Sequence, residues 1–72
     1  MTDLGLYLAK KSVNKAEVSR RSGISKARLT QLSNNTTTKL TVDELYKIAL
    51  SIGADPCELF LTVCKNIIIN QQ

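Results

Sequence analysis

The most constraining feature of the sequence is a helix-start signal that occurs five times in 72 residues. Each time, a residue suited to cap a helix N-terminus follows an apolar residue, and a second apolar residue stands five positions after the first. This is the spacing of the hydrophobic staple, in which the two apolar side chains pack across the cap. The caps with their staple pairs are Thr2 (Met1, Leu6), Asn14 (Val13, Val18), Ser25 (Ile24, Leu29), Thr41 (Leu40, Leu45) and Asp55 (Ala54, Leu59). The chain is therefore predicted to be an all-α domain of five short helices.

Further boundary signals agree with these starts. Glu17 and Glu44 stand three residues after their caps, which predicts capping boxes, and Pro56 suits the first position of the fifth helix. Gly23 and Gly53 are predicted to end the second and fourth helices, because Gly adopts the left-handed conformation without steric cost. All Gly and Pro residues are interpreted as boundary residues. Residues with helical spacing form the predicted core: Val18, Ile24, Leu29 and Leu32 between the second and third helices, and Leu45, Ile48, Ala49 and Ile52 on the fourth.

The two halves of the chain differ in charge. Residues 1–39 hold eight Lys or Arg against two acidic residues, a net charge of +6, whereas residues 40–72 hold two Lys against four acidic residues, a net charge of −2. A basic half beside an acidic half indicates a polyanionic partner for the first half and another role for the second.

Several classes of protein are disfavoured. Cys57 and Cys64 lack CxxC spacing and the chain has no His, which argues against a zinc or redox site, so both are interpreted as buried or half-buried apolar side chains. No phosphate loop, carboxylate pair or nucleophile with a nearby base is visible, so we expect neither an enzyme nor a cofactor. No signal peptide or transmembrane stretch is recognised, and we expect a cytoplasmic protein without a membrane partner.

Residues 15–34 have the organisation of a helix-turn-helix. Two short helices are joined by a turn containing Gly23, with the small Ser19 where the helices would cross. The stretch reads NKAEVSRRSGISKARLTQLSNN, and it is followed by LTVDELYKIALSIGADPCELF. Over about residues 4–60 the chain resembles the Cro/C1-type helix-turn-helix domain of phage repressors and small bacterial regulators. The resemblance implies a five-helix, lambda-repressor-like fold that binds double-stranded DNA, usually as a dimer on a two-fold operator.

The chain departs from the usual family pattern in four places. Lys15 stands where Gln is common, Ser19 where Ala is common, and Leu8 where some members have a phosphate-binding Arg. Residues 33–35 replace a frequent Glu-Gly. The phosphate contacts of this chain are therefore expected to differ in detail from those of other members.

The third helix is predicted to read the major groove. At about 100° per residue, Leu29 and Leu32 face inward, Arg28 and Ser33 flank the outer face, and the outer face carries no carboxylate. Gln31 is suited to adenine, Lys26 to guanine or phosphate, and Thr30 and Ala27 to the thymine methyl group. Arg28 and Lys15 suit phosphate, the latter at a helix N-terminus. The predicted DNA-binding residues are Lys15, Ser25, Lys26, Ala27, Arg28, Thr30, Gln31, Asn34, Asn35 and Lys39.

The predicted function is a sequence-specific transcriptional regulator, most simply a repressor. The alternative is an antitoxin or protein-interaction module whose C-terminal half holds a partner protein. Residues 1–61 are predicted to form the domain and residues 62–72 an apolar tail, which either extends the fifth helix or forms an edge strand. The predicted homodimer interface comprises Leu59, Phe60, Val63, Ile67, Ile68 and Ile69.

Overall fold

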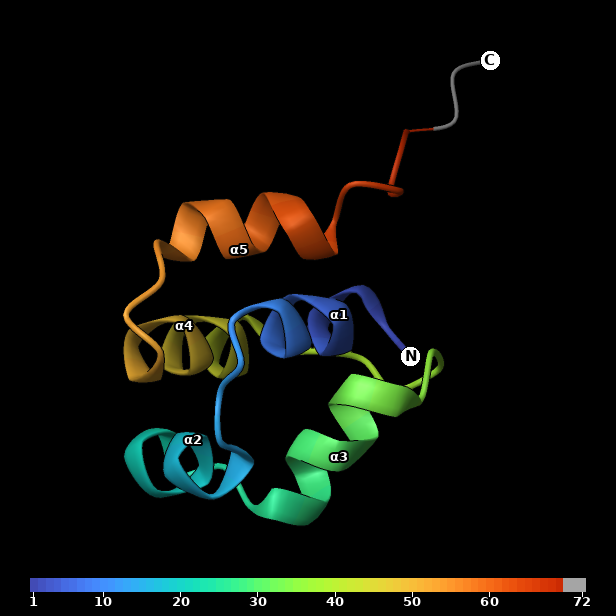
Figure 1. Cartoon of the computed structure of the whole chain (residues 1–72). Helices are drawn as coiled ribbons and strands as arrows, with labels where there is room; N and C mark the ends of the chain where they lie inside the picture. The colour runs from blue at the N-terminus through green and yellow to red at the C-terminus, as the bar shows by residue number, and fades with distance from the viewer. Residues whose placement is uncertain (70–72) are drawn as a thin grey trace.

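The computed structural model describes residues 1–69 and confirms the all-α prediction. Its helices are α1 (Asp3–Lys10), α2 (Lys15–Ser22), α3 (Lys26–Asn34), α4 (Val42–Ser51) and α5 (Pro56–Val63), and the described residues contain no strand. In Figure 1, α1 and α4 lie between α5 on one side and the α2–α3 pair on the other. Helix α1 packs on α3 and α5, and α4 packs on α2 and α5, so residues distant in sequence close around one core.

All five predicted caps are confirmed, because each cap side chain accepts a hydrogen bond from a backbone N–H in the first turn of its helix. The Thr41–Glu44 capping box is complete. The predicted box at Asn14 is wrong: the Glu17 carboxylate instead accepts two hydrogen bonds of 2.7 Å from the Arg20 guanidinium. A paired, charged donor is a stronger partner for a carboxylate than a single neutral amide, and this decides the contact. The same guanidinium holds the pKa of Glu17 below its usual value.

Two of the three glycines mark helix ends as predicted, and the third does not. Gly23 (φ 80°) and Gly53 (φ 70°) adopt the left-handed conformation just after α2 and α4. Gly5, however, is buried inside α1, so its interpretation as a boundary residue is wrong. A Cβ atom there would collide with the Ser33 carbonyl oxygen and would come 2.6 Å from Met1 Cγ. Gly5 is thus required by the close approach of α1 to the end of α3.

The core confirms most of the predicted inward positions. Val18, Ile24, Leu29 and Leu32 are buried together, as are Leu45, Ile48 and Ala49, while Ile52 packs against them half-buried. Four staple pairs lie in or against this core. The first pair does not, because α1 turns Leu4, Tyr7 and Leu8 inward and leaves Met1 and Leu6 exposed. Tyr7 also ties α1 to α5, since its hydroxyl donates to Glu58 at 3.3 Å, and burial beside this carboxylate raises the pKa of Tyr7.

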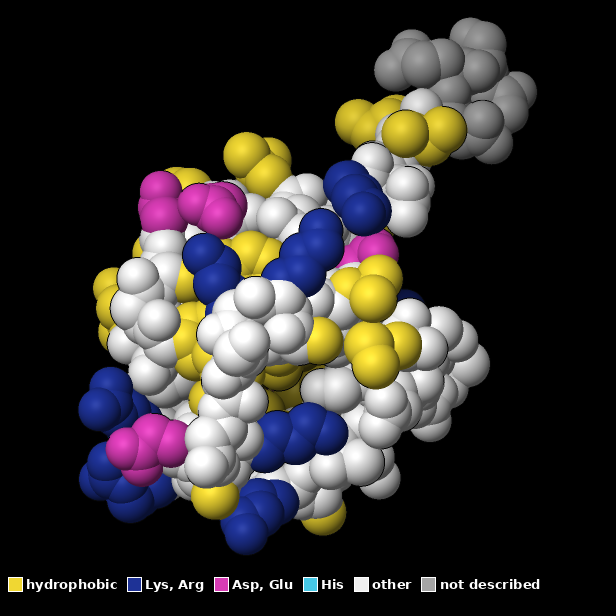
Figure 2. Space-filling model, in the orientation of Figure 1, with side chains coloured by type: hydrophobic (Ala, Val, Ile, Leu, Met, Phe, Trp, Pro, Cys, Tyr) yellow, Lys and Arg dark blue, Asp and Glu magenta, His cyan; other side chains and the backbone are white. Residues whose placement is uncertain are grey.

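Over its described residues the predicted tail extends the fifth helix only through Thr62 and Val63, and it forms no strand. Helix α5 ends at Val63, residues 64–66 form a turn, and residues 67–69 are irregular. The predicted boundary after Leu61 therefore falls within α5. Ile67, Ile68 and Ile69 are 73%, 83% and 82% exposed, and the chain here leads away from the body (Figures 1 and 2). Residues 70–72 of the predicted tail lie outside the described residues. None of the described helices has the length and apolar character required to cross a membrane.

Candidate nucleic-acid interface

The helix-turn-helix unit is formed by α2, the Gly23 turn and α3. The turn is closed by two short-range hydrogen bonds: Gly23 N donates to Ser19 O at 2.9 Å, and Ile24 N donates to Ser22 Oγ at 3.1 Å. Ile24, Val18 and Leu29 fill the space beneath the turn. These contacts fix the angle between the two helices and leave the opposite side of α3 uncovered.

The outer face of α3 has the composition that the sequence predicts. Its residues, all exposed and none acidic, are Lys26, Ala27, Thr30, Gln31 and Asn34. Leu29 and Leu32 are 1% and 3% exposed on the opposite side. One flank differs from the prediction, because Ser33 is 3% exposed rather than on the surface. The N-terminus of α1 covers it, and the Ser33 carbonyl accepts hydrogen bonds from Thr2 N at 2.8 Å and Thr2 Oγ1 at 2.9 Å.

Arg28, the other flank, is engaged inside the protein. Its Nε donates to Glu44 Oε2 at 2.7 Å, and its Nη2 donates to Glu44 Oε1 at 3.0 Å and to the Lys39 carbonyl at 3.0 Å. Glu44 also accepts from Thr41 N at 3.0 Å. One ion pair thus joins α3, the loop after it and the start of α4. Nη1 has no hydrogen-bond partner among the described residues, and the adjacent carboxylate offsets much of the Arg28 charge.

The contacts around Glu44 change its acidity. The Arg28 guanidinium, followed by the hydrogen bonds from Thr41, lowers the pKa of Glu44 from 4.5 to about 2. The side chains of Arg28 and Glu44 are 34% and 17% exposed, so solvent screens the pair only in part. Glu44 therefore remains ionised at neutral pH and keeps Arg28 in place.

The remaining predicted contact residues surround α3 from two sides. Ser25 caps α3 and accepts from Arg28 N at 3.1 Å, while Asn35 folds the following loop by accepting from Thr37 N at 2.9 Å. Lys15 begins α2, and Lys39 lies in the loop before α4. Lys15, Lys26 and Lys39 are exposed, and none forms an ion pair with another described residue. In Figure 2, Lys and Arg side chains lie at the lower left and lower centre, where α2 and the start of α3 lie in Figure 1, and further ones lie across the upper half of the same face.

This geometry agrees with the comparison to known protein families. The family model for the Cro/C1-type HTH DNA-binding domain matches residues 4–65. The chain belongs to this family. It is therefore a DNA-binding regulator of the Cro/C1 type, and the match extends beyond the helix-turn-helix to include all of α5. Searches of curated proteins and of solved structures found no match.

Sequence reasoning missed two features of this Cro/C1-type domain. The Arg28–Glu44 pair joins residues sixteen positions apart in different helices, a separation that carries no periodic signal. Gly5 looks unremarkable in a sequence, because only its α3 neighbour makes a side chain impossible there. The prediction for the cysteines is also corrected in part, since Cys64 is half-buried as expected whereas Cys57 is exposed at the start of α5.

Proposed function

We propose that this protein is a sequence-specific transcriptional repressor that inserts α3 into the major groove of DNA. The observation that carries the proposal is the exposed outer face of α3, which is polar and free of carboxylates and lies beside three lysines that form no ion pair with another described residue. A repressor of this kind acts by occupying an operator, and we place it in the cytoplasm with its DNA.

Within this proposal the side chains divide into base-reading and backbone-binding groups. Gln31 is placed to read adenine through two hydrogen bonds, and Thr30 and Ala27 to contact thymine methyl groups. Lys26 reads guanine or binds phosphate. Backbone contacts come from the residues around α3: Lys15, Ser25, Arg28, Asn34, Asn35 and Lys39. Arg28 makes its contact through Nη1, because its Nε and Nη2 are bound to Glu44 and the Lys39 carbonyl.

Base reading and backbone binding predict different effects of mutation. Gln31→Ala is expected to relax base preference at one position of each half-site and to weaken cognate binding by about 1–3 kcal/mol. Lys15→Ala is expected to weaken binding to all sequences alike, because a phosphate contact carries no base information. Selection from a random DNA pool with each variant measures both effects. Identical sequence preferences in the two variants would show the assignment to be wrong.

We further propose that the repressor acts as a homodimer. One recognition helix reads too few base pairs to select a single operator, so two-fold pairing with half-sites about 34 Å apart is the expected solution. Leu59 is fully buried in the core and is removed from the predicted interface, because its side chain cannot reach a partner. The surface that remains consists of the half-exposed Phe60, the partly buried Val63 and the exposed Ile67, Ile68 and Ile69.

Salt dependence tests the DNA-binding proposal as a whole. If each subunit neutralises about four phosphates, the log–log slope of affinity against salt concentration should be about −7 for a dimer. Titration of labelled DNA at four or more salt concentrations gives the slope. A slope flatter than about −2 would contradict binding through the charged face of α2 and α3.

A further inference from the structure

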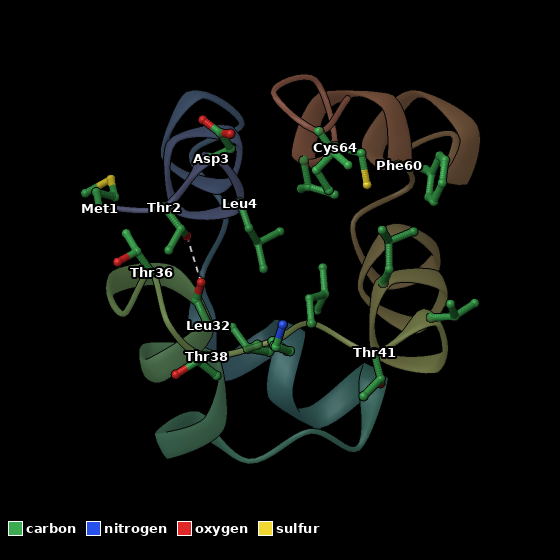
Figure 3. A pocket seen from close by; sticks show the side chains of 16 residues that line it. Met1, Thr2, Asp3, Leu4, Leu32, Thr36, Thr38, Thr41, Phe60 and Cys64 are labelled. Atoms are coloured by element: carbon green, nitrogen blue, oxygen red, sulfur yellow. Dashed lines mark hydrogen bonds between the residues drawn. The ribbon is translucent and has the colours of Figure 1, made fainter. Parts of the chain in front are cut away.

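A groove of about 580 Å³ opens beside the C-terminal end of α5. It lies between the N-terminus of α1, the loop after α3, the start of α4 and the end of α5 (Figure 3). Leu4 and Leu32 lie at its floor, 3% exposed each, whereas Val42 (78%) and Phe60 (50%) stand on its rim. Most of the polar residues that line the groove are uncharged threonines. The groove therefore suits an aliphatic, uncharged segment.

The chain carries such a segment immediately next to the groove. Ile67 lines the groove edge, and Ile68 and Ile69 continue outward from it, both more than 80% exposed. Residues 66–69 carry no charge. Three consecutive exposed isoleucines and an apolar groove open to water are each unfavourable, and burial of the isoleucines in the groove would remove both apolar surfaces from water.

Two contacts hold the chain at the point where Ile68 and Ile69 leave the groove edge. Lys65 Nζ lies 3.7 Å from Asp3 Oδ1 at the groove edge, and Ile67 N donates to Cys64 O at 2.9 Å, which closes the turn after α5. The chain then leaves the body, as the hydrophobic side chains at the upper right of Figure 2 show. Ile68 and Ile69 therefore do not enter the groove of their own chain in this structure, and a second copy offers them the same groove.

We propose that Ile67–Ile69 of one copy occupies the groove of a second copy, and that the exchange is reciprocal. The two contacts are then equivalent under a two-fold axis and together bury six isoleucine side chains. The inference deepens the dimer part of the proposed function by naming the surface that receives the tail. Because the groove is also lined by Thr36, Thr38 and Lys39, which follow α3, the exchange sets the position of each recognition helix relative to its partner.

Two full-length variants test the groove and the isoleucine segment independently, because each alters only one of them. Val42→Glu places a carboxylate on the groove rim at the first position of α4, where a negative charge is compatible with the helix N-terminus. The double variant Ile68→Asn, Ile69→Asn makes the segment polar. Leu50→Glu is the matched control, since it adds the same charge on the same helix at an exposed position (58%) that does not line the groove.

Sedimentation and circular dichroism measure association and folding of each variant. We expect the unaltered chain and Leu50→Glu to dimerise, and Val42→Glu and the isoleucine double variant each to associate at least tenfold more weakly while remaining folded. The decisive measurement is an equimolar mixture of the two impaired variants. One intact segment then meets one intact groove, and we expect heterodimers tighter than either homodimer.

Each other outcome overturns the exchange. A two-stranded pairing of the tails predicts that Val42→Glu alone dimerises normally and that mixing restores nothing. A tail that folds into its own groove, or a groove kept for another protein, predicts that the unaltered chain stays monomeric at tens of micromolar. Half-site DNA binding is measured in parallel, so a failed exchange in a chain that still binds DNA is distinguished from failure of the proposed function.

Discussion

Glu44→Gln is expected to destabilise the domain even though it removes only one charge from the surface of a basic protein. The substitution leaves Arg28 without its two-oxygen partner and weakens the cap of α4, because Glu44 also accepts from Thr41 N. The shift in the pKa of Glu44 corresponds to at most about 3 kcal/mol, which partial exposure reduces to roughly 1–2 kcal/mol. In a domain of this size such a loss lowers Tm by about 5–15 °C. Thermal unfolding at neutral pH measures it.

Asp43→Asn is the matched control for this prediction. Asp43 is the neighbouring acidic residue on α4, is exposed, and forms no ion pair with another described residue, so its neutralisation should change Tm by less than about 3 °C. Equal destabilisation by both variants would show that the loss arises from charge alone. On this expectation, Glu44 supports the loop that carries Lys39 and the flank of α3 on which Arg28 lies.

The same ion pair predicts how stability depends on pH. Because the pKa of Glu44 is depressed from 4.5 to about 2 on folding, its contribution is complete above pH 4.5 and is lost as the pH falls from 4.5 toward 2. The Glu44→Gln variant has no carboxylate at this position, so it never makes this contribution and cannot lose it as the pH falls. The difference in unfolding free energy between the two proteins should therefore shrink over that interval, and a difference that stays constant would contradict the assigned pKa.

Gly5→Ala is expected to lower the free energy of unfolding by roughly 2–3 kcal/mol, the range of an overpacked core. From helix propensity alone the substitution should stabilise α1 by about 1 kcal/mol. The added Cβ instead meets the Ser33 carbonyl oxygen, a backbone atom that accepts hydrogen bonds from Thr2 N and Thr2 Oγ1 and cannot move without breaking these bonds. Urea unfolding measures the change, and DNA affinity should fall with it because α3 ends at this contact.

Gly23→Ala and Gly53→Ala are the controls. Both positions have positive φ, but an added Cβ atom meets no atom within 4 Å at either one. Each should therefore cost only the left-handed conformation of a non-glycine residue, about 1–2 kcal/mol. We expect Gly5→Ala to be the most destabilising of the three. A stabilising Gly5→Ala would show that α1 does not approach α3 as closely as the structure has it.

Part of the candidate site follows from the sequence because it depends on local geometry. The outer face of α3 is set by the 3.6-residue period, which places Leu29 and Leu32 inward and Gln31 outward whatever surrounds the helix. The flanks of that face are not local. Ser33 is buried by α1, and Arg28 is bound by α4, and neither neighbour is close in sequence.

What the sequence determined by itself is where each helix begins, which sides of α2, α3 and α4 are apolar, and the helix-turn-helix with its family. These are short-range properties, set by caps, staples and helical periodicity within a few residues. Only the tertiary structure decided that Gly5 lies at a helix contact, that Leu59 belongs to the core, that Arg28 pairs with Glu44, and that a groove opens beside the last isoleucines. Each of these depends on the distance between residues of different helices, which the packing of the whole domain sets and no local pattern records.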